Sequence, residues 1–138
     1  METITNKYEA KLEELQTVLD TNEENLMMHG ATMKNTMSIN IALEEIFVNV
    51  CHYAYEGLEN KGVEVTYCFD GENEKITFVD EGIPFNPLER QDPDVTMSAQ
   101  DRRIGGLGIY MVKKSMDKCE YERKDGKNIF SFTKNFKA

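Results

Sequence analysis

Three short stretches of this chain combine residue types that could do chemistry together. In IALEEIFVNV, Glu45 and Asn49 stand four residues apart, which places them one turn apart on one helix face. A carboxylate there could act as a base, and an amide oxygen is a ligand that Mg²⁺ accepts. The stripe continues to either His52 or Tyr53. An ordinary exposed helix face would also account for this pair.

The second stretch is FVDEGIPFNP, residues 78–87. Asp80 ends a predicted strand, and Gly82 and Pro84 then turn the chain. A carboxylate at the mouth of an apolar pocket could accept a hydrogen bond from an exocyclic amine such as that of adenine. A plain Asp–Gly turn explains the same residues, so both interpretations stay open.

The third stretch is GGLGIYMV, in which Gly105, Gly106 and Gly108 precede an apolar, helix-like run. The first N–H groups of a helix attract anions, and glycine lets the backbone approach a phosphate closely. The flanking pairs Arg102-Arg103 and Lys113-Lys114 make this region locally positive. A tight loop is the alternative, and the absence of a GxxxxGK pattern excludes a P-loop.

The periodicity predicts which elements carry these stretches. Apolar residues at helical spacing indicate one helix from Tyr8 to about Met28, which ends at His29-Gly30. Thr32 can cap a second helix from about residue 33 to 55. A strand near residues 3–7 is a weaker prediction.

Later in the chain the period changes to two. Residues 63–69 and 75–80 alternate around Asp70-Gly71, and residues 119–124 and 128–134 flank Asp125-Gly126, so each set predicts a hairpin. A helix follows the glycines, between the two hairpins. Because hairpins build antiparallel sheet and the helices need a face to cover, we predict an α+β fold. It would be a two-layer α/β sandwich with a mostly antiparallel sheet and about three helices on one face.

Composition limits the class of protein. The 138 residues suit a single domain, 1–138, and 40% of them are apolar, as in globular proteins. A formal net charge of −9 disfavours a nucleic-acid binder. The N-terminus has no secretion-signal pattern and no apolar run is long enough to span a membrane, so we expect a cytoplasmic protein. Three separated cysteines predict free thiols.

Together, Glu-x-x-x-Asn, Asp-x-Gly-x-Pro-Phe, a long connection and Gly-Gly-x-Gly-Ile-x-Met-Val resemble the motifs of the GHKL ATPase superfamily. That superfamily includes gyrase, MutL proteins, heat-shock chaperones and histidine kinases, and the likeness spans residues 36 to 117. Within it, ALEEIFVNV and GIPFNPLE look like the anti-sigma-factor serine/threonine kinases.

The resemblance implies a Bergerat-type ATP site with specific roles. Glu45 would be the general base, Asn49 would hold Mg²⁺ against ATP, and Asp80 would receive the adenine amine. The segment 86–104 would form a lid. Further ATP contacts would come from Tyr53, Gly82, Ile83, Phe85, Arg103, Gly105, Gly106, Leu107, Gly108 and Ile109. The chain departs from the family in two places. Its lid lacks a Thr-Thr-Lys-like phosphate contact, for which Thr96, Arg102 and Arg103 are the nearest substitutes, and Tyr53 stands where some relatives have His.

The resemblance also implies partners. A kinase of this type phosphorylates an STAS-domain anti-anti-sigma protein and sequesters a sigma factor, and its relatives are often homodimers. Two alternatives remain at this stage: a nucleotide-binding regulatory module without kinase activity, and a detached histidine-kinase-like catalytic domain.

Overall fold

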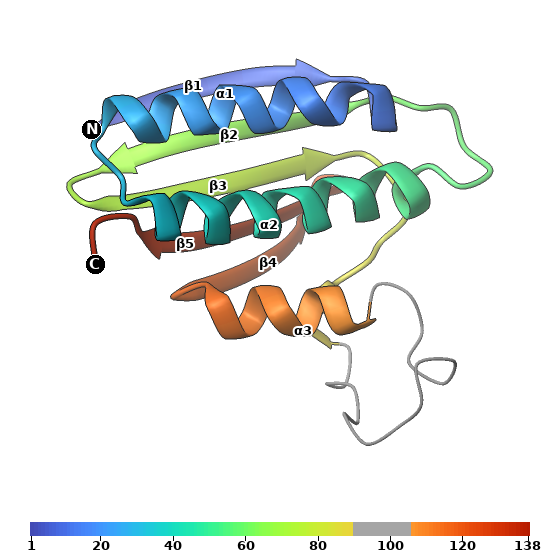
Figure 1. The fold of residues 1–138 in the computed structure, drawn as a ribbon. Coiled ribbons are helices and arrows are strands. Elements are labelled where there is room, and N and C mark those ends of the chain that lie inside the picture. The colour runs from blue at the N-terminus through green and yellow to red at the C-terminus, as the bar shows by residue number, and fades with distance from the viewer. Residues whose placement is uncertain (90–105) are drawn as a thin grey trace.

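The computed structural model describes residues 1–89 and 106–138, apart from the side chains of Gly106 and Leu107. Five strands and three α-helices alternate in blocks along the chain (Figure 1). In order, the elements are β1 (Glu2–Tyr8), α1 (Leu15–Met28), α2 (Met33–Asn49), β2 (Val63–Asp70), β3 (Asn73–Asp80), α3 (Gly106–Ser115), β4 (Lys118–Lys124) and β5 (Lys127–Asn135).

All the strands belong to one antiparallel sheet of order β1-β2-β3-β5-β4. Both predicted hairpins are present. In the second, Asp125 (φ 52°) and Gly126 (φ 76°) adopt the left-handed conformation that a tight two-residue turn requires. In the first, Asp70 still pairs with Asn73, so the turn consists of Gly71 and Glu72.

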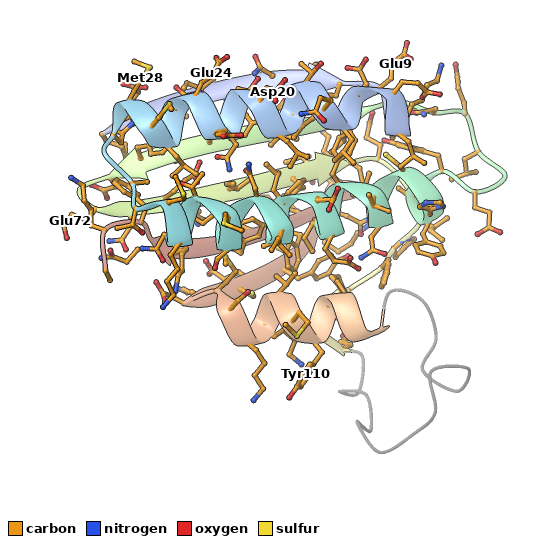
Figure 2. All side chains as sticks on the ribbon, in the orientation of Figure 1. Glu9, Asp20, Glu24, Met28, Glu72 and Tyr110 are labelled. Atoms are coloured by element: carbon orange, nitrogen blue, oxygen red, sulfur yellow. The ribbon has the colours of Figure 1, made fainter. Side chains whose placement is uncertain are left out.

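The three helices lie on one face of this sheet (Figure 1), which confirms the predicted two-layer α+β sandwich. Alternate residues of β2 and β3 point toward the helices and are buried, whereas their neighbours on the other face are partly exposed. The buried set includes Val65, Tyr67, Ile76 and Phe78. Charged side chains of α1 such as Asp20 and Glu24 point away from the sheet (Figure 2).

The prediction of one helix from Tyr8 to Met28 was wrong at its start. Residues Glu2–Tyr8 form an edge strand paired with β2, a single 3₁₀ turn follows at Leu12–Glu14, and α1 begins at Leu15. Tyr8 is buried, its ring meets Phe47 edge-on, and its hydroxyl lies 3.0 Å from that of Tyr67. These long-range contacts favour the strand over the helical pattern, and the weaker prediction of a strand near residues 3–7 is confirmed.

The central helix α2 begins and ends as the sequence predicts. The Thr32 side chain accepts a hydrogen bond from the Asn35 N–H (3.1 Å), which is the expected N-cap. Beyond Asn49 the helix widens into a π-helical turn, Val50–Ala54. Such turns often accompany functional sites, and this one stands next to the residues considered below.

The sequence pattern did not predict the burial of one polar group. Glu74 of β3 is 1% exposed and lies beneath α1 and α2. With its amide nitrogen toward Glu74, the Asn22 side chain donates to both carboxyl oxygens, at 3.2 and 2.6 Å, and it also meets Asn40 at 2.7 Å. Burial raises the pKa of the Glu74 carboxyl well above its ordinary value of 4.5.

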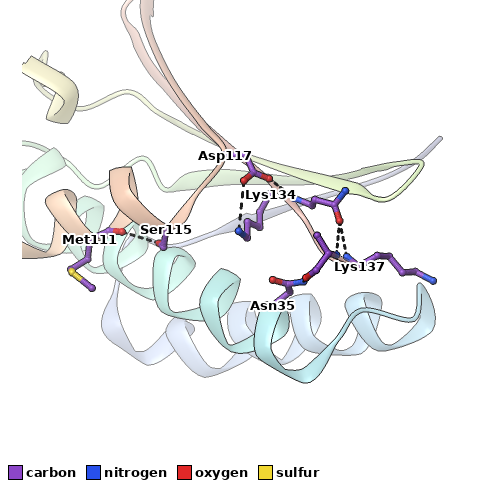
Figure 3. Close-up of polar contacts among 8 residues, drawn as sticks. Asn35, Met111, Ser115, Asp117, Lys134 and Lys137 are labelled. Atoms are coloured by element: carbon purple, nitrogen blue, oxygen red, sulfur yellow. Dashed lines mark hydrogen bonds and ion pairs between the residues drawn. The ribbon is translucent and has the colours of Figure 1, made fainter.

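The end of the chain contacts the start of α2 and the connection that follows α3 (Figure 3). Asp117 accepts the Asn135 N–H (2.7 Å) and pairs with Lys134 (3.6 Å), so the connection from α3 into β4 is tied to β5. The Asn35 amide donates to the Ala138 carbonyl (2.7 Å). These contacts attach the α3–β4 connection to β5 and the last residue to the start of α2.

Candidate functional site

Glu45 and Gly108 line a cavity between α2 and α3, whereas most of the other predicted site residues that the structure describes line a separate pocket. It lies where the end of α2, the end of β3 and the first turn of α3 meet, and it encloses about 470 Å³, counting space open to solvent. Its lining is mostly apolar and includes Ile46, Val50, Ile83, Phe85, Ile109 and Phe130, with Asp80 as the acidic residue.

Glu45 and Asn49 stand one turn apart on α2, as predicted. The Asn49 amide nitrogen donates to Glu45 Oε1 at 3.3 Å. Within the described residues no group donates to the Asn49 amide oxygen, the atom that a hard cation such as Mg²⁺ prefers. Both side chains are partly buried, so the pair is not an ordinary exposed helix face.

The α3 helix packs directly against the Glu45 carboxyl group. A Cβ placed on Gly108 would collide with that group, so a larger residue at this position would require the Glu45 side chain to move. Burial raises the pKa of Glu45, the hydrogen bond from Asn49 lowers it, and the neighbouring Glu44 charge raises it. The net shift is upward, which makes Glu45 a stronger base than a free carboxylate.

Asp80 is 6% exposed and its carboxyl group is held from one side. Oδ1 accepts the Gly82 N–H (2.9 Å) and the Asn128 side-chain amide (3.0 Å). The described residues supply no donor to Oδ2, so this oxygen can take a donor from a ligand. A plain Asp–Gly turn would not require a buried carboxylate at a pocket.

Gly82 is where the turn meets α2. A Cβ at this position would lie 2.8 Å from the Cα of Ala54 and overlap its carbonyl group. The adjacent Ile83 N–H donates to the Ala54 carbonyl at 2.9 Å, which ties the turn to the π-helical end of α2. The Glu81 N–H donates to the Tyr55 hydroxyl (2.8 Å) and strengthens the same attachment.

Asn128 of β5 and Tyr121 of β4 were missed at the sequence level, although both border the pocket. Asn128 is the register partner of Asp80 across β3 and β5. Arg123 was missed too, and its guanidinium donates to the Gly82 carbonyl (2.9 Å). The only sequence signal was the position of Asn128 in the second hairpin, and using it requires knowing that β5 pairs with β3.

The other predicted contacts fall into three groups. Tyr53, which continues the Glu45 stripe, lines the pocket, whereas His52 does not. Gly106 and Leu107 belong to the first turn of α3, in which Ile109 lines the pocket. Arg103, Gly105 and most of the predicted lid, together with Thr96 and Arg102, lie outside the described residues.

Other predicted features can be compared directly. Cys51, Cys68 and Cys119 are free thiols, as expected. None of the helices in the described ranges is long and apolar enough to cross a membrane. Within the same ranges no three His, Cys, Asp or Glu side chains gather as a metal site.

Comparison with known proteins places this arrangement in a family. The family model described as histidine kinase-like ATPase domain matches residues 8–134. The serine-protein kinase RsbW of Listeria monocytogenes is 26% identical over 104 residues, covering 72% of this chain and 66% of that protein. The anti-sigma F factor of Clostridium acetobutylicum is 29% identical over 98 residues, covering 70% and 66%. The chain thus spans just under two thirds of the length of these relatives.

Solved structures share the fold. The RsbU and RsbW domains of Rv1364c from Mycobacterium tuberculosis match with a TM-score of 0.71 at 17% identity, covering 98% of this chain and 32% of that one. The SiaB–SiaC complex from Pseudomonas aeruginosa matches with a TM-score of 0.64 at 13% identity, covering 95% and 88%.

Proposed function

Because the chain belongs to the family of histidine kinase-like ATPase domains, we propose that it binds ATP with Mg²⁺ and phosphorylates a serine or threonine of a partner protein. The observation that carries the proposal is that Asn49 and Asp80 line one pocket and that Asn49 donates a hydrogen bond to Glu45. The relatives named as a serine-protein kinase and an anti-sigma factor support this choice within the family.

The adenine ring would enter the apolar part of the pocket. The open oxygen of Asp80 accepts the exocyclic amine, and Ile83, Phe85 and Ile109 supply apolar surface for the ring. In a base with a carbonyl at the corresponding position, the carbonyl oxygen and the Asp80 oxygen would both be acceptors, so no hydrogen bond could form between them. The acceptor oxygen of Asp80 therefore fits adenine better than guanine.

The triphosphate would lie toward Asn49 and the first turn of α3. Phosphoryl transfer depends on positioning and charge neutralisation, and a bound Mg²⁺ supplies the latter. Asn49 offers its amide oxygen to the cation, since its nitrogen is already committed to Glu45. The N–H groups at the start of α3 favour phosphate oxygens, and the predicted contacts of Arg103 and Gly105 would add to them.

Glu45 would accept the proton of the attacking hydroxyl. The raised pKa of Glu45 suits this role, because a stronger base removes a proton more readily. The bond from Asn49 keeps the carboxylate oriented toward the phosphate side of α2. Replacing the carboxylate with an amide would retain the shape and remove the base.

For the acceptor, we propose an STAS-domain anti-anti-sigma protein, with a sigma factor as the sequestered partner. The names of the relatives motivate this choice, and the fold shared with the SiaB–SiaC complex is compatible with it. Homodimer formation stays a prediction.

The test is a calorimetric titration with ATP and Mg²⁺, followed by incubation with labelled ATP and candidate STAS proteins. We expect Asn49→Ala to abolish Mg²⁺-dependent binding, and Glu45→Gln to bind ATP while transfer falls about a hundredfold or more. Absence of ATP binding by the folded wild type would refute the proposal. Binding without transfer to any acceptor would instead indicate a regulatory module, and an acid-labile phosphate on the acceptor would indicate a histidine kinase.

A further inference from the structure

Asn128 connects Asp80 with the rest of its turn. The Asn128 amide nitrogen donates to Asp80 Oδ1 (3.0 Å) and to the Ile83 carbonyl (2.7 Å). The amide oxygen accepts the Phe85 N–H (3.2 Å) and the Tyr121 hydroxyl (2.5 Å). The side chain is 6% exposed, and its two donor hydrogens and both lone pairs are all in use.

This set of partners permits only one orientation of the Asn128 amide. If the oxygen and nitrogen were exchanged, the oxygen would face Asp80 and the Ile83 carbonyl, which are both acceptors. The nitrogen would face the Phe85 N–H, which is a donor. Because the oxygen must therefore face Tyr121, the Tyr121 hydroxyl is the donor in its bond.

We propose that Asn128 is a positioning residue for nucleotide recognition, and that the Tyr121 hydroxyl fixes its orientation. This inference rests on the proposed ATP site. Asn128 holds one oxygen of Asp80 and leaves the other for the base, while it also clamps the turn that carries Ile83 and Phe85. Since its own hydrogen-bonding groups are all committed, Asn128 acts through Asp80 rather than on the base itself.

Together with contacts from α2, the bonds of Asn128 attach the turn on two sides. On the α2 side, the Ala54 carbonyl and the Tyr55 hydroxyl take the N–H groups of Ile83 and Glu81. The β4–β5 hairpin contributes three bonds of Asn128, to Asp80, Ile83 and Phe85, and the bond from Arg123 to the Gly82 carbonyl. Loss of the hairpin side would leave the Gly82 N–H as the remaining described donor to the Asp80 carboxyl, although the turn would stay attached to α2.

Substitution of Asn128 by aspartate tests the role through its pH dependence. Asn128→Asp removes both donors and sets a second carboxylate against Asp80 Oδ1. Two carboxylates in one buried site cannot both ionise readily, so one of the pair takes up a proton near neutral pH. That shared proton restores a donor between them.

Titratable and charged groups lie around Asp80 on several elements. Tyr55 and Glu81 lie on the α2 side, and Tyr121, Arg123 and Lys127 lie on the hairpin. At the open end of the sheet, Lys7, Lys61 and Glu64 line a pocket that Asp80 also borders. Within the described residues none of these side chains bonds the Asp80 carboxyl directly.

The experiment is calorimetric titration of the full chain with ATP and Mg²⁺ at several pH values. We expect Asn128→Asp to weaken ATP binding about tenfold or more at about pH 8, with affinity recovering toward about pH 6. Tyr121→Phe removes only the hydroxyl and should weaken binding about threefold to tenfold at every pH. Asn73→Asp, on the exposed start of β3, is the matched control and should bind as the wild type does.

The results separate this inference from the proposed function. A wild type that binds ATP, with Asn128→Asp and Tyr121→Phe binding equally well at each pH, would overturn the inference alone. A lower melting temperature of Asn128→Asp with no pH-dependent change in its ATP affinity would also overturn it, because that is the signature of a purely structural role. If Asn128→Asp does not fold, the affinity of Tyr121→Phe decides. A folded wild type that binds no ATP would remove both proposals.

Discussion

Replacement of Gly82 by alanine tests whether the Asp80 turn must press against the main chain of α2. The added Cβ would lie 2.8 Å from the Cα of Ala54 and overlap its carbonyl group. Main-chain atoms cannot rotate aside, so the turn must move and the bond from Ile83 to Ala54 is stretched or lost. Overpacking costs about 1–3 kcal/mol and the hydrogen bond about 1 kcal/mol, which predicts a loss of about 2–4 kcal/mol in unfolding free energy.

The assay is urea unfolding of Gly82→Ala beside the wild type, with ATP titration of the folded variant. Because Asp80 moves with the turn, we expect ATP affinity to fall at least tenfold. The comparison variant is Gly108→Ala, whose Cβ would meet only the end of the flexible Glu45 side chain, so its unfolding free energy should change by less than about 1 kcal/mol. If Gly82→Ala unfolds with a free energy within about 0.5 kcal/mol of the wild type and binds ATP equally well, close contact between the Asp80 turn and α2 is not required.

Three further predictions concern other parts of the molecule. Gly108→Ala should displace Glu45 and lower the phosphoryl-transfer rate about a hundredfold. The double variant with Glu45→Gln should transfer no more slowly than Glu45→Gln alone. Additive losses of rate would show that the two residues act independently. The buried Glu74 carboxyl has a pKa well above 4.5, so wild-type stability should fall as pH rises from the unfolded pKa through the folded one. Glu74→Gln should remove that decline, and parallel stability–pH curves from urea unfolding would contradict the assignment. Thr32→Ala should lower stability by about 0.5–2 kcal/mol in thermal unfolding because the Asn35 N–H loses its cap, whereas Thr17→Ala, at an exposed position of α1, should change it by less than about 0.5 kcal/mol.

Local interactions explain why much of the architecture was predictable. The Thr32 cap, the Asp125-Gly126 turn and the alternation along β2 each depend on residues that are close in sequence. The same holds for the Glu45–Asn49 pair, whose spacing fixes both side chains on one helix face once the helix forms. Tyr8 shows where this logic failed, because its partners Phe47 and Tyr67 are distant in sequence and favour a strand.

Sequence alone therefore determined the element types, the two-layer class and the three stretches that border the pocket. Tertiary structure decided what completes the site, because β5 inserts between β3 and β4 and brings Asn128 opposite Asp80. It also decided the burial of Glu74 beneath two helices. Strand order and burial arise from contacts between residues far apart along the chain, and the spacing of residues within one stretch carries no record of those contacts.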